Sequence, residues 1–202
     1  MTMAVRAWRL VAPMAILAAI GANLGAAIAG ADFNPFDHFG YFTNQVNLVA
    51  AAVLLLAAPR TALARPAWLE HARAAVTVYL VIVVTVYWTM IFPTAEVERP
   101  WANAIIHGLS ATVVALDWLV EGPRRTLPMR QVWVPMVYPL VWVGVVVIRG
   151  ATDGWYPYPF MDPAQGYGAI ATVVGGIVVA GVALSAVVFQ ATRWRTVPAH
   201  QA

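Results

Sequence analysis

Two short polar clusters interrupt a sequence that is otherwise dominated by apolar residues. The first is FTNQVN at positions 42–47, which places one hydroxyl and three side-chain amides directly before the apolar run LVAAAVLLLAA. The second contains Asn103 and His107, which are four residues apart and therefore share one face of a helix. Thr43 and Asn47 have the same spacing, so each cluster predicts a short polar stripe on a helix.

Together these residue types could carry out acyl transfer. His107 would accept the proton of the Thr43 hydroxyl, which would attack an ester carbonyl and form an acyl-enzyme. Side-chain amides of Asn44, Asn47 and Asn103 could stabilise the oxyanion. The same imidazole would then activate a water molecule that releases the acid. A hydrolytic site with Thr43 as nucleophile and His107 as base is therefore one interpretation of the two clusters.

Each residue also has a plainer interpretation. A threonine at the start of a helix is typical of a cap, and amides such as Asn44, Gln45 and Asn47 are typical of hydrogen bonds between membrane helices. Asp117 follows His107 by ten residues. That separation is about 15 Å along a helix, which favours a structural or interfacial role over membership of a catalytic triad. The residues alone leave both interpretations open.

The sequence segments that contain and surround these polar residues are strongly apolar. The 202-residue chain is 61% hydrophobic and 10% charged, and six runs approach or reach the length that crosses a bilayer. These runs cover residues 10–28, 41–58, 74–92, 103–120, 132–148 and 169–189. We expect the first run to be a retained helix and not a cleaved signal. The fold class predicted is an all-α polytopic membrane protein with six transmembrane helices, forming a single domain over residues 1–202.

The basic residues indicate the topology. All twelve are arginines, and ten of them lie in alternate connections and in the two terminal segments: Arg6, Arg9, Arg60, Arg65, Arg73, Arg124, Arg125, Arg130, Arg193 and Arg195. The other connections hold only two, Arg99 and Arg149. Because positively charged loops stay in the cytoplasm, both termini are predicted to be cytoplasmic. The arginines flank loops and form no patch, so no nucleic-acid partner is expected.

Two prolines allow the depth of the polar clusters to be predicted. Pro35 and Pro100 are both suited to the first turn of a helix, where the missing N–H is harmless. Thr43 and His107 would then lie about 10–12 Å inside helices that enter from the same side, at a matching depth. If the second helix began at Phe42 instead, Thr43 would lie near the rim of the membrane.

An aromatic loop precedes the last apolar run. It contains WYPYPFMD at positions 155–162, and Trp155, Tyr156, Tyr158 and Asp162 are the residues of interest. So many aromatic groups are unusual for a flexible linker. We expect either an ordered cap over the outer mouth of the helix bundle, covering an entrance, or a simple anchor at the membrane interface.

Several functions are excluded or disfavoured by composition. There is no lysine for a retinal Schiff base and no cysteine for thiolate or metal–thiolate chemistry. His107 is the only histidine within a predicted span, so a bis-histidine haem is excluded. No metal and no organic cofactor is implied. The main rival to a hydrolase is a non-catalytic membrane protein that binds a lipid or small ligand in a regulatory or sensory role.

Three motifs carry a resemblance to a known family. FTNQVNL, NAIIHG and DGWYPYPFMD occur in this order between about Tyr41 and the end of the last run. With the six spans, they resemble the androgen-induced-protein family of membrane hydrolases, in its short bacterial branch. That resemblance implies a multi-pass protein of the bacterial inner membrane that acts on fatty acid esters of hydroxy fatty acids. It also implies that Thr43 is the nucleophile and His107 the base.

The sequence departs from the animal members of this family directly after Thr43. An amide pair, Asn44 and Gln45, follows the threonine here. The expected substrate class is therefore broader than that of the animal members: a lipid-like fatty acyl ester taken from the membrane lipids. The function expected from the sequence is an integral membrane lipid hydrolase, with the non-catalytic binder as the alternative.

Overall fold

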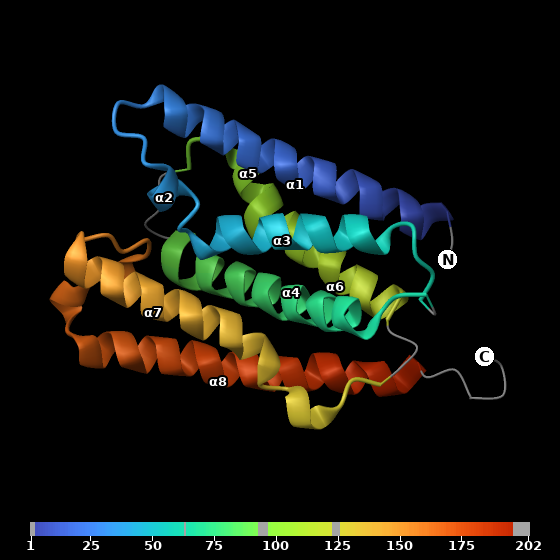
Figure 1. Ribbon diagram of the computed structural model, residues 1–202. Coiled ribbons are helices and arrows are strands. Elements are labelled where there is room, and N and C mark those ends of the chain that lie inside the picture. Colours follow the sequence, from blue (N-terminus) through green and yellow to red (C-terminus); the bar gives the residue numbers. More distant parts are fainter. Residues whose placement is uncertain (1–2, 63, 93–96, 123–125, 196–202) are drawn as a thin grey trace.

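The computed structural model describes residues 3–62, 64–92, 97–122 and 126–195, which form helices and loops with no β-strand among them (Figure 1). The principal helices are α1 (Met3–Ala29), α2 (Pro35–His38), α3 (Phe42–Ala57), α4 (Ala67–Val86), α5 (Pro100–Ala104), α6 (Ser110–Val120), α7 (Val137–Thr152) and α8 (Tyr167–Ala191). Two π-helical turns continue α4 and α5, at Tyr87–Ile91 and Ile105–Leu109. Short 3-10 helices occupy Met129–Gln131, Val134–Met136, Pro159–Met161, Pro163–Gln165 and Thr192–Arg195.

Five helical segments of the described chain are long and apolar enough to cross a membrane. They are Met3–Ala29, Ala67–Ile91, Pro100–Val120, Met129–Thr152 and Tyr167–Ala191. The remaining predicted span, residues 41–58, corresponds to α3, which has only 16 residues. Its length is about 24 Å, shorter than the roughly 30 Å of a bilayer core. The all-α class is confirmed for the described residues, and the five long apolar helices are compatible with a polytopic membrane protein.

The helices form a bundle around α4 (Figure 1). This helix packs against α3, α6 and α8, while α1 packs against α3 and α5. In Figure 1 the start of α1 and the end of α8 lie at the same end of the molecule. Helix α2 and the loop between α7 and α8 lie at the opposite end. The residues of interest for function are concentrated at this second end.

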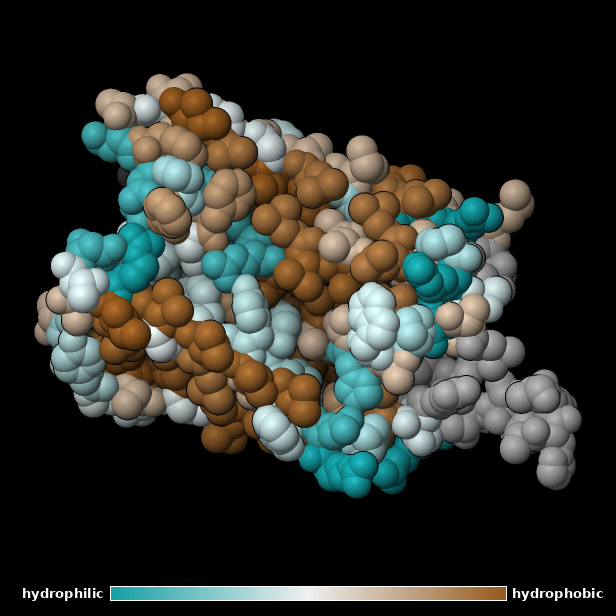
Figure 2. Space-filling view, in the orientation of Figure 1, coloured by the Kyte–Doolittle hydropathy of each residue, from teal (hydrophilic) through white to brown (hydrophobic). Residues whose placement is uncertain are grey.

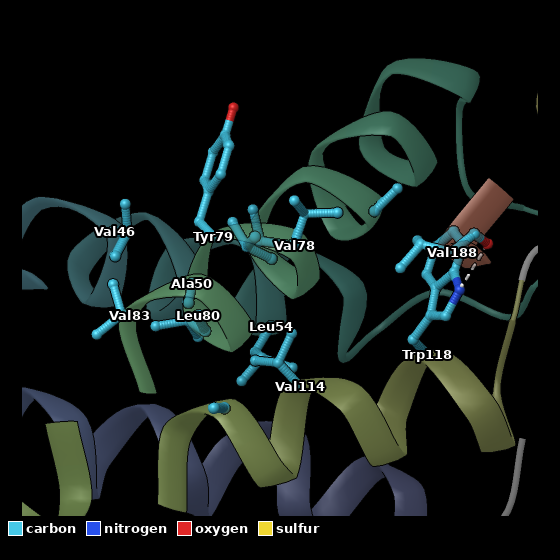
Figure 3. Close-up of a cluster of buried hydrophobic side chains, with 14 of the residues drawn as sticks. Val46, Ala50, Leu54, Val78, Tyr79, Leu80, Val83, Val114, Trp118 and Val188 are labelled. Atoms are coloured by element: carbon cyan, nitrogen blue, oxygen red, sulfur yellow. Dashed lines mark hydrogen bonds between the residues drawn. The ribbon is translucent and has the colours of Figure 1, made fainter. Parts of the chain in front are cut away.

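Small and branched side chains fill the core between these helices (Figure 3). Val46, Ala50 and Leu54 of α3 are at most 2% exposed and follow the four-residue spacing of one helix face. They meet Val78 and Leu80 of α4, both fully buried, in one hydrophobic cluster. Burial at this density explains why α3 and α4 hold a constant position relative to each other.

The outer surface of the bundle is apolar along its length (Figure 2). Helix α7 exposes Leu140, Val141 and Ile148, with exposed fractions between 49% and 63%. Helix α1 similarly exposes Val11 and Met14. Figure 2 shows polar side chains at both ends of the molecule and a smaller polar group on the face between them, near the start of α3. Large apolar side chains exposed in a band between polar ends are compatible with contact to lipid tails.

Some of the arginines that were interpreted as loop flanks are buried inside the bundle. Helices α1 and α4 begin earlier than predicted, so that Arg9 and Arg73 are helical and nearly inaccessible to solvent. Both bind Asp117 of α6, with Arg9 Nε 2.6 Å from Oδ1 and Arg73 Nη2 2.6 Å from Oδ2. The structural role expected for Asp117 agrees with these contacts.

The buried ionic cluster extends from Asp117 to the adjoining loops. Arg73 Nη1 lies 2.7 Å from Glu70 Oε2, and Glu70 also pairs with Arg65. Arg65 in turn lies near Glu121, with Nη1 3.6 Å from Oε2. Buried charges persist only when they are paired in this way.

Arg124 and Arg125 lie outside the described residues, as does the side chain of Arg195.

Candidate functional site

Thr43 lies in the first turn of α3, at the end of the bundle that carries α2. Pro35 occupies the first turn of α2 and Pro100 the first turn of α5, as predicted. However, α2 ends at His38 and the chain turns before α3 begins at Phe42. The depth derived by counting from Pro35 is therefore wrong for Thr43. The alternative, in which the helix begins at Phe42, is the one observed.

The side chain of Thr43 is 7% exposed and contacts the aromatic loop. Its backbone N–H donates to the hydroxyl of Tyr158 across 3.4 Å. Its Oγ1 lies 3.4 Å from the same hydroxyl. A first-turn N–H has no partner within its own helix, so this loop supplies one. Tyr158 therefore lies beside both the backbone N–H and the hydroxyl of Thr43.

His107 lies in the π-helical turn Ile105–Leu109 and is held on two sides. Its Nδ1 is 2.8 Å from Oδ1 of Asn103, a contact that the shared helix face of these two residues allows. Its ring stacks on Tyr87, with centroids 3.5 Å apart and planes inclined by 10°. Because the amide oxygen accepts, Nδ1 carries the hydrogen and Nε2 keeps its lone pair. Isolated π-helical turns occur frequently at functional sites.

Asn47 connects the helix of Thr43 to the turn of His107. It is completely buried, and its Nδ2 donates to the carbonyl oxygens of Thr43 (2.9 Å) and Ile106 (3.0 Å). The Ile106 carbonyl belongs to the π-helical turn and also accepts from the Ser110 hydroxyl at 3.4 Å. Asn47 therefore keeps the first turns of α3 beside the residue that precedes His107.

The two amides next to Thr43 bind the end of α2. Asn44 Nδ2 donates to the carbonyl oxygen of His38 at 2.7 Å, and Gln45 Nε2 donates to that of Phe39 at 2.8 Å. The Gln45 oxygen accepts from the hydroxyl of Tyr138. These contacts satisfy carbonyls that are left open where a helix ends. They also explain how a four-residue helix can hold its position.

A polar cavity brings the candidate residues together. Bounded by the described residues, it has a volume of about 570 Å³ and is lined by Thr43, Asn44, Asn103, His107 and Tyr158, together with residues of α1 and Arg99. Within the described structure, no hydrogen bond joins Thr43 to His107. The structure therefore places the predicted nucleophile and base on the wall of one cavity, each with a different immediate partner.

A second, apolar crevice adjoins this cavity. It has a volume of about 80 Å³ and lies between α4, α7 and α8, with Ile82, Val86 and Val178 among its lining residues. Thr43, Tyr87, Ile91 and Tyr158 line both spaces. Thr43 is thus situated at the boundary between a polar and an apolar compartment.

The aromatic loop lies against the start of α3. Trp155 contacts the ring of Tyr41 edge-on at 6.0 Å and the guanidinium of Arg149 at 4.2 Å. Tyr158 stacks on Phe160 at 5.4 Å. Asp162 accepts from the N–H of Ala164 at 2.8 Å and so caps a 3-10 turn. The loop is ordered over the Thr43 side of the cavity, and its role as an entrance cover stays a prediction.

Two site residues make contacts that the sequence did not indicate. Tyr158 was expected only as part of the loop that would cover the entrance, and Tyr87 was given no role. The phenol of Tyr158 reaches Thr43 across 115 positions of chain, and Tyr87 meets His107 across a separation of twenty. No local spacing signals such contacts, because they depend on how separate helices pack.

Comparisons with protein-family models, with curated proteins and with solved structures found no match to this chain. Among the described residues, no group of three or more histidine, aspartate or glutamate side chains could hold a metal ion. The chemistry of the site is therefore inferred from the geometry of its own side chains.

Proposed function

We propose that this protein is an integral membrane hydrolase that cleaves fatty acyl esters, with Thr43 as nucleophile and His107 as base. The observation that carries the proposal is the shared cavity, in which Thr43 and His107 face one space while Asn103 holds the imidazole. A nucleophile, a base and a group that orients the base are the arrangement on which acyl transfer depends. The resemblance of the motifs to the androgen-induced-protein family supports the same pair.

The reaction would proceed in two halves. Nε2 of His107 takes the proton as Oγ1 of Thr43 bonds to the ester carbon, and the carbonyl electron pair moves to oxygen. Collapse of this intermediate breaks the bond to the alcohol, which leaves with the proton from His107. Water then gives a proton to Nε2 and attacks the acyl-threonine, releasing the acid and restoring the Thr43 hydroxyl. Because no hydrogen bond joins the two residues in the described structure, the reaction requires Nε2 to approach Oγ1, directly or through one water, when substrate binds.

The two adjoining spaces suggest how an ester would lie. The apolar crevice between α4, α7 and α8 would accommodate part of the acyl chain. The polar cavity would receive the other side of the ester, near Arg99 and Asn103. Thr43 lines both spaces, and a scissile carbonyl at their boundary would face its hydroxyl. This placement favours a substrate with one strongly apolar and one more polar side.

The proposal includes a six-span topology with both termini in the cytoplasm of a bacterial cell. Helix α3 would cross the membrane in addition to the five longer helices, although it is short. Ten of its 16 residues are buried, and it lies between α1 and α4. A helix shielded by its neighbours does not need to match the full hydrocarbon thickness, because protein and not lipid surrounds its ends. The cavity would then open toward the outer leaflet.

Active-site labelling tests the proposed function. The protein in detergent is treated with a fluorophosphonate probe, which phosphonylates activated hydroxyl groups. We expect labelling of the wild type, no labelling of Thr43→Ala, and labelling at least about 100-fold slower in His107→Ala, because general-base assistance contributes on the order of 100-fold or more. Thr85→Ala is the matched control, since Thr85 is exposed and bonds only its own helix at Val81. Equal labelling of wild type and Thr43→Ala would contradict the proposal.

One observation favours the second candidate, a protein that binds a lipid or small ligand without cleaving it. The Thr43 hydroxyl lies beside Tyr158 and not beside His107. If the folded wild type binds a lipid-like ester but is not labelled and releases no acid, the binding function replaces the hydrolase. Mass spectrometry of the intact ester after incubation separates the two outcomes.

A further inference from the structure

We propose that Tyr158 is a further catalytic residue, whose phenol O–H and the backbone N–H of Thr43 together bind the oxyanion of the reaction. The inference rests on the proposed hydrolase function and adds to it the group that stabilises the intermediate. An ester hydrolase needs donors aimed at the position where negative charge develops. The sequence suggested side-chain amides for this role, and the contacts of the folded chain point to a different donor.

The amides beside Thr43 already donate to backbone carbonyls. Asn44 Nδ2 binds the carbonyl oxygen of His38, and Asn47 Nδ2 binds those of Thr43 and Ile106. Moving the Asn47 amide toward a substrate would break its bonds to two carbonyl oxygens in a completely buried position, and moving that of Asn44 would break its bond to His38. A buried polar group that loses its partner costs about 1–3 kcal/mol.

The N–H of Thr43 donates to the Tyr158 hydroxyl through a long bond, which an oxyanion between these two donors would replace without leaving a carbonyl unpaired. The Tyr158 hydroxyl is 3.4 Å from both the backbone nitrogen and Oγ1 of Thr43. An oxygen atom held by the phenol and by this N–H would be adjacent to the attacking Oγ1. The N–H also belongs to the first turn of a 16-residue helix, where the helix dipole favours a negative charge.

The phenol can act as a donor throughout the physiological range. Burial raises the pKa of Tyr158 to about 12, so the hydroxyl keeps its proton at neutral pH. It can therefore donate a hydrogen bond to the oxyanion without transferring the proton. The proton balance of the two half-reactions stays with His107, as described above.

The ring of Tyr158 is held in place, which preorganises its hydroxyl. It packs against Tyr41 at 5.9 Å and Trp142 at 5.8 Å, and stacks on Phe160 at 5.4 Å. A donor fixed before the reaction costs no reorganisation when charge develops. The aromatic loop would thus bring a catalytic group to the site in addition to covering it.

The variant Tyr158→Phe tests this role, because it removes the hydroxyl and keeps the ring. With the full chain in liposomes and a nitrophenyl acyl ester as substrate, we expect kcat to fall about 100- to 1000-fold, the usual loss for one oxyanion donor. KM should change little. Tyr167→Phe is the matched control, since Tyr167 begins α8, lines neither space and is 56% exposed. An unchanged kcat in Tyr158→Phe would overturn the assignment.

A second measurement separates catalysis from loop stability. A trifluoromethyl ketone adds the nucleophile and forms an oxyanion, whereas the matched methyl ketone binds largely without addition. Loss of an oxyanion donor should therefore reduce the preference for the trifluoromethyl ketone by about 100-fold in Tyr158→Phe. A loosened loop would weaken both inhibitors alike and leave the preference unchanged, which would overturn the proposal. If Thr43→Ala retains wild-type kcat, the hydrolase function itself fails; if Thr43→Ala is inactive and Tyr158→Phe is not, only the role of Tyr158 fails.

Discussion

The imidazole of His107 is oriented by two partners of different chemistry. Tyr87 covers one ring face, while Asn103 accepts from Nδ1 at 2.8 Å. A group that binds one ring nitrogen decides which nitrogen keeps the lone pair needed for base catalysis. In the proposed site, Asn103 has the role that a carboxylate has in many hydrolases. At the residue scale, catalysis should therefore depend on Asn103 although it does not react.

Asn103→Ala is predicted to slow fluorophosphonate labelling by about 10- to 100-fold, the usual loss when an orienting partner is removed. Asn103→Asp should restore most of the rate, because a carboxylate oxygen also accepts from Nδ1. The labelling rate constant is measured for each variant in detergent. Asn23→Ala is the control, since Asn23 lines the same cavity from α1. A wild-type rate in Asn103→Ala would show that His107 needs no such orientation.

At the scale of elements, the turn between α2 and α3 controls where the aromatic loop lies. Gly40 occupies this turn, and its carbonyl accepts from Trp142 Nε1 at 2.8 Å. A Cβ at this position would lie 2.6 Å from both the carbonyl oxygen of Phe36 and the ring of Trp155. Contacts this short require movement of the backbone or of the loop. The turn therefore needs a glycine for close approach.

Gly40→Ala is predicted to destabilise the protein by about 1–3 kcal/mol, the range observed when an added group overfills a packed site. It should also slow labelling of Thr43, because displacement of Trp155 shifts the loop that carries Tyr158. Thermal unfolding in detergent and the labelling rate are the two measurements. Gly175→Ala is the control: its Cβ would meet no atom within 4 Å, and alanine favours the helix of α8. Equal melting temperatures for the two variants would contradict this account of the turn.

At the scale of the whole molecule, the two ends differ in chemistry. One end contains the buried cluster in which Arg9 and Arg73 bind Asp117. The other contains the cavity and the aromatic loop. In a membrane, a bundle whose two ends differ in this way would present a different surface to each side. The arginine distribution predicts that the charged end faces the cytoplasm.

The absence of cysteine from the sequence allows a direct test of this topology. Single cysteines replace Asp32, in the connection after α1, and Arg130, near the opposite end; both residues are exposed. In intact cells a membrane-impermeant maleimide should label Asp32→Cys and should label Arg130→Cys only after lysis. The wild type provides the background because it cannot react. The reverse pattern would place the termini outside the cell.

The apolar runs determined most of the secondary structure. The predicted run 169–189 lies within α8 and the run 41–58 differs from α3 by one residue at each end, because a long apolar segment in lipid must satisfy its backbone internally as a helix. The starts of α1 and α4 were placed too late. Arg9 and Arg73 were interpreted as flanking charges, and charges that are paired inside a bundle do not mark a helix end.

By itself, the sequence determined the all-helical class and the shared helix face of Asn103 and His107, because both follow from composition and from the period of a single helix. Only the tertiary structure decided that α2 stops before Thr43, that Tyr87 stacks on His107, and that Tyr158 reaches Thr43. These three features depend on side chains that meet across separate elements. Packing and hydrogen bonding between distant segments have no periodic signature in the sequence. Only the folded arrangement of the helices brings these side chains together.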